Sequence, residues 1–125
     1  MEIPKQYLPV MPYLILNNSA EFLEFTKSVF QATEQYITRH ENGEIMHGEI
    51  RIGDAVVMFA QASETFPIKP AGMFIYVEDV DQTYDLGLRE KCNSLMIPEQ
   101  KDYGYTAGFE DLFGNQWWLV QPEKK

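Results

Sequence analysis

The sequence predicts an α+β protein in which two tandem βαβββ modules form a cupped antiparallel sheet with the helices on the outside. Two observations predict this fold. Apolar strand-like runs around Ile15 and Ile75, 60 residues apart, each lead into a polar helix start. Two long β-type stretches are each broken by a Gly-polar turn, at Gly53-Asp54 and 61 residues later at Gly114-Asn115. A repeat of units this complex indicates a duplicated module whose two copies pack on each other.

The first module is expected over residues 8–62. Its strand at 12–16 is followed by a helix at 19–31, because Asn18 precedes Glu21 in the manner of a capping box and four apolar side chains share one helical face. Three antiparallel strands follow, since β-branched and aromatic residues dominate between turn residues. These strands are expected at 33–40, 45–52 and 55–61.

The second module is expected over residues 71–122, after a connector at 62–71 that contains Pro67 and Pro70. A strand at 73–77 leads to Asp79, which with Gln82 opens a helix that ends near Cys92. Three strands follow at 95–97, 103–110 and 116–121. The whole chain, 1–125, is expected to form one domain, since its length suffices to bury roughly two-thirds of the unfolded surface.

Composition excludes several function classes. The net charge is −9 with only 10 basic residues and no basic cluster, so a nucleic-acid backbone would be repelled. The N-terminus lacks the pattern of a signal peptide, and the longest uncharged run, 6–20, is interrupted by Pro9 and Pro12. We therefore expect a cytoplasmic protein with no membrane partner. The single cysteine, Cys92, has no activating His or Arg beside it and is interpreted as structural.

Three stretches of this chain resemble a known family. They are residues 12–14 running into the first helix, the stretch His-Gly-Glu-Ile-Arg-Ile-Gly-Asp at 47–54, and the stretch Glu-Asp-Leu-Phe-Gly-Asn-Gln-Trp-Trp at 110–118. With the two βαβββ modules they resemble the vicinal oxygen chelate superfamily. Within it they are most similar to the glyoxalase/bleomycin-resistance proteins of the PhnB-like branch. The resemblance covers nearly the whole chain, but activity does not follow from it, because one fold hosts many chemistries.

The resemblance implies three metal-ligand positions, in the first, fifth and eighth strands. Here the first falls on Met11 or Pro12, the second on Gly72 or Met73, and the third on Trp118. None of these supplies the oxygen or imidazole nitrogen that a divalent metal needs. We therefore expect no cofactor. Because the position in the eighth strand points into the cavity in relatives, Trp118 should do so too, and alternation sends Trp117 and Leu119 to the opposite face.

The third strand carries the candidate catalytic residues. Met46, Ile50 and Ile52 are expected on an apolar face, which leaves His47, Glu49 and Arg51 on the other. His47 could act as a general acid or base tuned by Glu49. Two other interpretations stay open: a structural His47–Glu49 pair without catalytic function, and a rearranged divalent-metal site. The latter would use His47, Glu49 and Glu110.

Aromatic side chains in the expected strands favour a binding cavity. Their alternation lets several of them face the cup, where they would suit a flat or cationic ligand that the acidic protein also attracts. Core packing is the alternative interpretation for any one of them, and Tyr103-Gly104-Tyr105 is expected at the mouth of the pocket. The candidate ligand-binding residues are Phe59, Phe74, Tyr76, Tyr103, Tyr105 and Trp118.

Three functions follow from these observations. The first is metal-independent binding of a small molecule, aromatic or cationic, in an aromatic-lined cup. The second is an enzyme, either a metal-dependent lyase or isomerase or a metal-free proton-transfer catalyst that uses His47 and Glu49. The third is a partner-binding domain whose cup is filled by its own side chains. The resemblance implies a homodimer in the first case.

Overall fold

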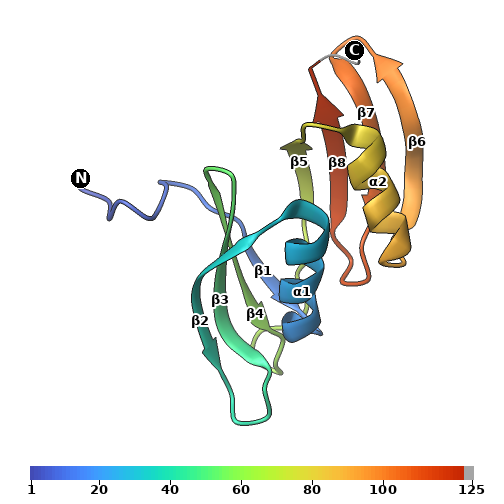
Figure 1. Ribbon diagram of the computed structural model, residues 1–125. Coiled ribbons are helices and arrows are strands. Elements are labelled where there is room, and N and C mark those ends of the chain that lie inside the picture. The colour runs from blue at the N-terminus through green and yellow to red at the C-terminus, as the bar shows by residue number, and fades with distance from the viewer. Residues whose placement is uncertain (123–125) are drawn as a thin grey trace. The chain divides into compact units, whose positions relative to one another are not determined.

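The computed structural model describes residues 1–122, and the chain divides into two units, Met1–Pro70 and Ala71–Lys125 (Figure 1). Each unit contains the order strand, helix and three strands. The prediction of an α+β protein built from two βαβββ modules is therefore confirmed.

The first unit contains β1 (Tyr13–Leu16), α1 (Ser19–Phe30), β2 (Thr33–Arg39), β3 (Ile45–Ile52) and β4 (Ala55–Gln61). The second contains β5 (Gly72–Tyr76), α2 (Val80–Arg89), β6 (Asn93–Lys101), β7 (Gly104–Glu110) and β8 (Gln116–Gln121). Strand β6 is longer than the expected 95–97, and α2 ends before the expected Cys92.

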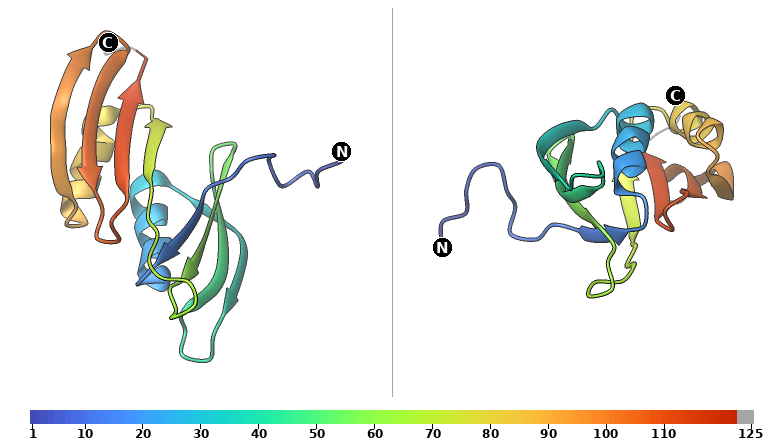
Figure 2. Two further views of the ribbon diagram at one scale, coloured as in Figure 1. Left: turned by 180° about the vertical axis from the view of Figure 1, so that it is seen from behind. Right: turned by 90° about the horizontal axis from the view of Figure 1, so that it is seen from below.

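Each unit has one four-stranded sheet, in the orders β1-β4-β3-β2 and β5-β8-β7-β6. The last three strands of each unit pair antiparallel, as expected, whereas the first strand pairs parallel to the fourth. One helix packs on one face of each sheet. Seen from behind, the strands of the second unit lie in front of α2, so the sheet face turned away from the helix is visible (Figure 2).

The helix-facing sides hold the core of each unit. In the first, Phe22 of α1 packs edge-on against Phe59 of β4, with ring centroids 5.0 Å apart. In the second, a Cβ on Gly87 of α2 would lie 2.3 Å from the ring of Phe109, so the absence of a side chain there lets helix and sheet approach closely. Trp117 and Leu119 are buried, as their alternation with Trp118 predicts.

In both helices, the backbone N–H of the first residue donates to a glutamine side chain from the last strand of the same unit. The side-chain oxygen of Gln61 accepts from the backbone N–H of Ser19 at 3.0 Å, and that of Gln121 accepts from the backbone N–H of Val80 at 2.7 Å. The capping role expected for Asn18 is wrong, because its side chain makes no cap hydrogen bond and Gln61 takes that place. Asp79 does cap α2, accepting from Gln82 N at 3.1 Å.

A β-bulge in β3 corrects one sequence prediction. Thr38 pairs with His47 and Arg39 pairs with Ile45, so Met46 is an extra residue without a partner on β2. The bulge shifts the alternation of side chains by one position. Ile45 therefore occupies the buried place, whereas Met46, which we expected on the face of Ile50, is 49% exposed.

Candidate functional site

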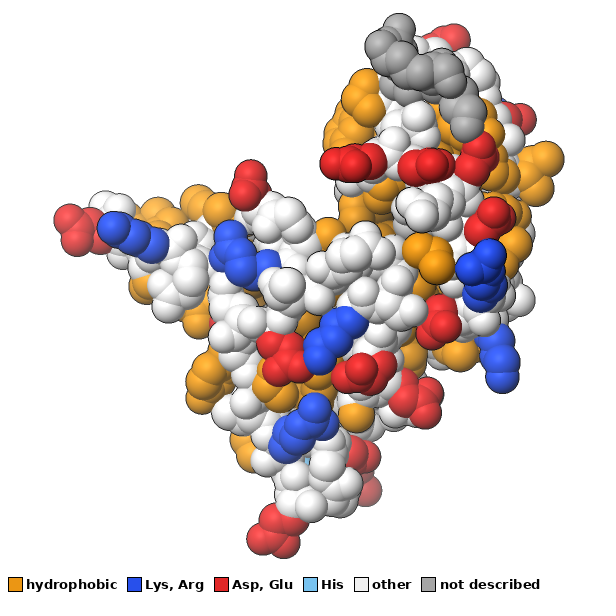
Figure 3. All heavy atoms as spheres, in the orientation of Figure 1, with side chains coloured by type: hydrophobic (Ala, Val, Ile, Leu, Met, Phe, Trp, Pro, Cys, Tyr) orange, Lys and Arg blue, Asp and Glu red, His pale blue; other side chains and the backbone are white. Residues whose placement is uncertain are grey.

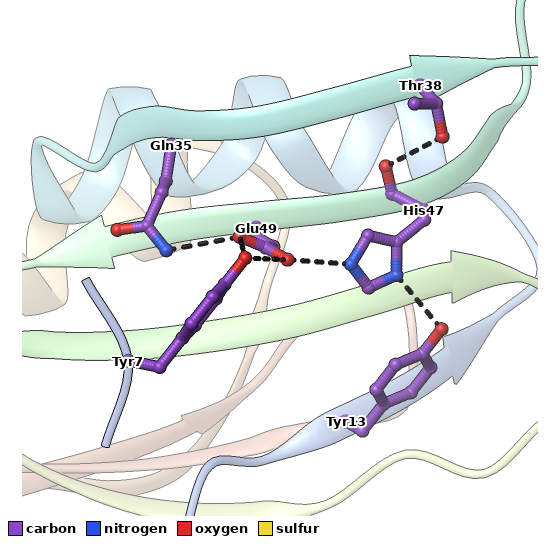
Figure 4. A network of polar contacts seen from close by, with 6 residues as sticks. All are labelled: Tyr7, Tyr13, Gln35, Thr38, His47 and Glu49. Atoms are coloured by element: carbon purple, nitrogen blue, oxygen red, sulfur yellow. Dashed lines mark hydrogen bonds and ion pairs between the residues drawn. The ribbon is translucent and has the colours of Figure 1, made fainter. Parts of the chain in front are cut away.

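A buried carboxylate lies at the centre of a polar network in the first unit. Glu49 of β3 is 3% exposed, on the sheet face away from α1. Its oxygens accept from Tyr7 Oη at 2.9 and 3.1 Å, from Gln35 Nε2 at 3.1 Å and from His47 Nε2 at 2.8 Å (Figure 4). Three side chains from three segments therefore converge on this carboxylate.

The network determines the charge of Glu49. Burial raises the pKa of this carboxyl group, but the hydrogen bonds from His47, Gln35 and Tyr7 and the charge of His47 outweigh it, so the net pKa lies below the ordinary value. The same contact raises the pKa of Tyr7, because its hydroxyl donates to the carboxylate. Glu49 is therefore an ionised acceptor.

His47 has a partner on each ring nitrogen. Nε2 contacts Glu49, and Nδ1 lies 3.0 Å from Tyr13 Oη of β1. The imidazole centroid lies 5.5 Å from that of Tyr13 and 6.2 Å from that of Tyr36. A carboxylate that orients an imidazole whose other nitrogen bonds a hydroxyl is an arrangement capable of proton transfer.

Arg51 shares this face with His47 and Glu49, as the strand alternation predicts. Its guanidinium donates to Gln35 Oε1 at 2.8 Å and to the backbone oxygen of Gln6 at 3.3 Å. Arg51 therefore fixes Gln35, a donor to Glu49, and ties the N-terminal segment over the network.

Sequence reasoning identified His47 and Glu49 but missed Tyr7, Tyr13 and Gln35. Tyr7 lies in a segment without periodicity, and Gln35 lies beside a register shift in β2, so no pattern pointed to either. A signal existed for Tyr13, because Leu14 and Leu16 are buried and alternation places Tyr13 on the opposite face.

The second unit gathers aromatic side chains on the sheet face away from α2. Phe74 of β5 pairs with Trp118 of β8, so both lie on one face, opposite Trp117. The Phe74 ring centroid lies 5.7 Å from that of Tyr76 and 6.2 Å from that of Tyr103. The aromatic face, as the term is used below, consists of Phe74, Tyr76, Tyr103 and Trp118.

The aromatic face is accessible. Phe74, Tyr76 and Tyr103 are 57%, 66% and 56% exposed. Figure 3 shows the opposite side of this unit, where α2 lies, and there hydrophobic and acidic side chains also reach the surface. Glu110 of β7 lies two residues after Gly108, which pairs with Trp118. The side chain of Glu110 therefore lies on the same face of the sheet as Trp118.

Two expected ligand-binding residues lie elsewhere. Phe59 is fully buried on the helix side of the first sheet, against Phe22 and over Gly48. Tyr105 also faces its helix, and its hydroxyl donates to Asp81 of α2 at 2.7 Å. The expectation that these two side chains face the open side of their sheets is therefore wrong. Phe59 pairs with Leu14 and Tyr105 pairs with Gln121, and both pairs lie on the helix-facing side.

The stretch 110–118 forms a structural turn. The buried Asp111 carboxylate accepts from Trp117 Nε1 at 2.8 Å, from Asn115 Nδ2 at 3.0 Å and from the backbone N–H groups of Phe113 and Asn115. Burial raises the pKa of Asp111, although these hydrogen bonds act in the opposite direction. The residues of this stretch, which carries part of the family resemblance, therefore hold the β7–β8 turn.

Cys92 is buried, and burial together with the nearby charges of Asp111 and Glu90 raises the pKa of its thiol to about 12. A thiol with this pKa is not a nucleophile at neutral pH. This supports its interpretation as a structural residue.

Comparison with known proteins identifies the family. The model of the glyoxalase/bleomycin resistance protein/dioxygenase superfamily matches residues 9–119. The chain belongs to this superfamily. A protein of Mycobacterium bovis, the uncharacterised Mb0911c, is 23% identical over 126 residues, which cover 91% of this chain and 83% of that protein.

Solved structures of the glyoxalase superfamily share the fold. PA1353 from Pseudomonas aeruginosa is 19% identical with a TM-score of 0.77, over 94% of this chain and 100% of that one. A putative 3-demethylubiquinone-9 3-methyltransferase, the PhnB protein of Bacillus cereus, is 17% identical with a TM-score of 0.70, over 91% and 99%. The likeness to the PhnB-like branch is confirmed at the level of the fold.

The residues of this glyoxalase superfamily member do not fit the metal site that the resemblance implies. Met11 and Pro12 precede β1, Gly72 and Met73 begin β5, and the indole of Trp118 covers Gly108 at the position in β8. Among residues 1–122, no three His, Cys, Asp or Glu side chains are grouped so that they could hold a metal ion. Of the alternative set, His47 and Glu49 belong to the first unit and Glu110 to the second.

None of the helices within residues 1–122 is both long and apolar enough to cross a membrane.

Proposed function

We propose that this glyoxalase superfamily member binds a small aromatic molecule on the aromatic face, without a metal ion. The observation that supports the proposal is the cluster of three largely exposed rings beside Trp118 on one face of the second sheet. Clustered, exposed hydrophobic side chains mark sites of interaction with a ligand or a partner. Trp118 replaces the metal ligand of relatives by a stacking surface.

The charge of the protein favours a cationic ligand. The net charge of −9 attracts cations, and Glu110 lies on the same face as Trp118. A cation held over an aromatic ring gains about 0.5–2 kcal/mol. We therefore propose a flat aromatic cation as the preferred class of ligand.

The test compares N-methylquinolinium, a flat aromatic cation, with neutral 2-methylquinoline. Both are titrated while tryptophan fluorescence is followed, with and without EDTA; both tryptophans, Trp117 and Trp118, lie in the second unit. Saturable binding that prefers the cation and is unaffected by EDTA supports the proposal. Binding that requires added Mn²⁺, Ni²⁺, Zn²⁺ or Fe²⁺ overturns it.

Variants locate the site. Phe74→Ala and Tyr76→Ala should each weaken binding of N-methylquinolinium about tenfold, whereas Leu112→Ala, which removes a side chain 56% exposed in the β7–β8 turn, should leave it unchanged. Equal affinities for all three variants would place the ligand elsewhere.

We propose, on the family resemblance, that the protein acts as a homodimer. Sedimentation equilibrium measures this directly for the wild type and for Phe74→Ala. A monomer in solution contradicts the proposal. A dimer that dissociates in Phe74→Ala assigns the exposed ring to the dimer interface rather than to a ligand.

Metal-free proton transfer is a second candidate function, favoured by the 2.8 Å contact between His47 Nε2 and Glu49 Oε2. Because the other ring nitrogen bonds Tyr13, a proton enters or leaves this site through the Tyr13 hydroxyl. The test follows exchange of the α-protons of hydroxyacetone in D₂O. His47→Ala should abolish enzyme-dependent exchange and His40→Ala, the other histidine, should not; equal rates in both variants contradict this function.

A further inference from the structure

A pocket in the first unit is lined by residues that do not belong to the aromatic face. Its volume is about 450 Å³, within the range of small-molecule pockets. The bulge in β3 turns Met46 toward it, and the segment after β4 folds back through a Ser63 N to Phe66 O hydrogen bond of 2.9 Å and paired backbone bonds between Ile15 and Lys69. The residues that line it are Tyr13, Ile15, Met46, Ala60, Gln61 and Phe66.

The lining is apolar except for the side chains of Tyr13 and Gln61, and the amide of Gln61 already makes hydrogen bonds within the protein. Gln61 Oε1 accepts from the N–H and the hydroxyl of Ser19, at 3.0 and 2.9 Å, and Gln61 Nε2 donates to Asn17 O at 2.8 Å. Its amide is therefore engaged in capping α1. The Tyr13 hydroxyl, 3.0 Å from His47 Nδ1, is the polar side-chain group of this lining that can serve a ligand.

The network behind Tyr13 sets the direction of its hydrogen bond. The ionised Glu49 carboxylate only accepts, so His47 Nε2 carries the proton that it shares with Glu49. In a neutral imidazole the other nitrogen, Nδ1, is then an acceptor, and Tyr13 must donate its own O–H to it. The Tyr13 oxygen keeps its lone pairs for a further donor.

We propose that this pocket binds a small, mainly apolar molecule that carries one hydrogen-bond donor, such as a phenol, whose O–H donates to the Tyr13 oxygen. The apolar walls hold the body of the molecule, and the Glu49–His47–Tyr13 chain selects a donor over an acceptor. The proposal does not depend on binding at the aromatic face, because the two sets of residues belong to different units.

The test uses two probes with the same ring, 4-methylphenol and 4-methylanisole; in the second a methyl group replaces the donor proton. Both are titrated into ¹⁵N-labelled full-length protein at one mildly alkaline pH. We expect the phenol to shift the amide signals of Ile15, Met46 and Ala60, with an affinity about tenfold above that of the anisole. Equal affinities for the two probes in the wild type overturn the proposal, without any variant.

Variants separate the donor selection from the apolar pocket. Tyr13→Phe should remove the preference for the phenol while both probes still bind, whereas Ser28→Ala, which removes the hydroxyl of an exposed residue of α1, should retain it. Phe66→Ala, at a side chain 64% exposed, should weaken both probes alike. A phenol preference that survives in Tyr13→Phe, or shifts confined to the second unit, contradicts the proposal; the latter result would leave binding at the aromatic face standing.

Discussion

The indole of Trp118 lies across Gly108 on the neighbouring strand, so that a Cβ at position 108 would lie 2.5 Å from the indole Cε3 and Cζ3 atoms. The two residues pair directly between β7 and β8. Because Gly108 has no side chain, the Trp118 indole can lie against β7. A substitution at Gly108 can therefore move the ring without a change to Trp118 itself.

Gly108→Ala should displace the Trp118 indole and weaken binding of N-methylquinolinium about tenfold, because the stacked cation loses its alignment with the ring. The measurement is the titration of tryptophan fluorescence, in which the free variant should also show a shifted emission maximum.

Gly72→Ala is the matched control. The nearest atom to a Cβ at that position is Gln116 Oε1 at 4.0 Å, so this variant should bind as the wild type does. Unchanged affinity in Gly108→Ala would separate Trp118 from the binding site.

The buried Glu49 carboxylate should make the first unit sensitive to acid. Its folded-state pKa is depressed, so its ionised form contributes stability above the unfolded value near 4.5, and this contribution is lost as the pH falls through the folded pKa. The free energy of urea unfolding should therefore fall more steeply below that pH in the wild type than in Glu49→Gln, which cannot ionise. The difference between the two proteins isolates Glu49 from other carboxylates. Parallel pH profiles would show that Glu49 does not titrate in this range.

The sequence predicted the elements better than it predicted the site. Repetition after 60 residues and strand alternation were enough for the two modules, because both depend on neighbours along the chain. Alternation also placed Trp118 opposite Trp117, and His47 with Glu49 and Arg51 on one face.

The remaining residues were missed for physical reasons. Tyr7 reaches Glu49 across 42 positions of sequence from a segment without regular structure, so no local pattern encodes the contact. Met46 was misplaced because a bulge breaks the period of two. Phe59 and Tyr105 were included as aromatic residues of expected strands, but their pairing partners Leu14 and Gln121 face the helices.

The carboxylate of Asp111 should be essential to the second unit for a structural reason. In Asp111→Asn, an amide N–H replaces an acceptor oxygen, so the buried N–H of Trp117 or of Asn115 loses its partner. We expect a loss of about 2 kcal/mol, the cost of one unsatisfied buried donor. Urea unfolding followed by the fluorescence of Trp117 and Trp118 measures it. Asp102→Asn, at an exposed carboxylate in the β6–β7 turn, should unfold at the wild-type urea concentration. A neutral effect of Asp111→Asn would mean that the turn re-forms its hydrogen bonds with the amide.

The duplicated module predicts a matched pair of variants at the helix starts. Gln61→Ala removes the acceptor for the N–H of Ser19, and Gln121→Ala removes the acceptor for the N–H of Val80. Loss of a helix cap costs about 1 kcal/mol, equivalent to an approximately fivefold change in a local opening equilibrium. Amide hydrogen exchange should therefore accelerate by about fivefold in α1 alone for Gln61→Ala and in α2 alone for Gln121→Ala. Gln100→Ala, whose side chain donates to its neighbour Lys101 O, should change neither helix. If either cap variant accelerated exchange in both helices equally, the two units would open as one cooperative body, and the cap would report the stability of the whole chain rather than of its own module.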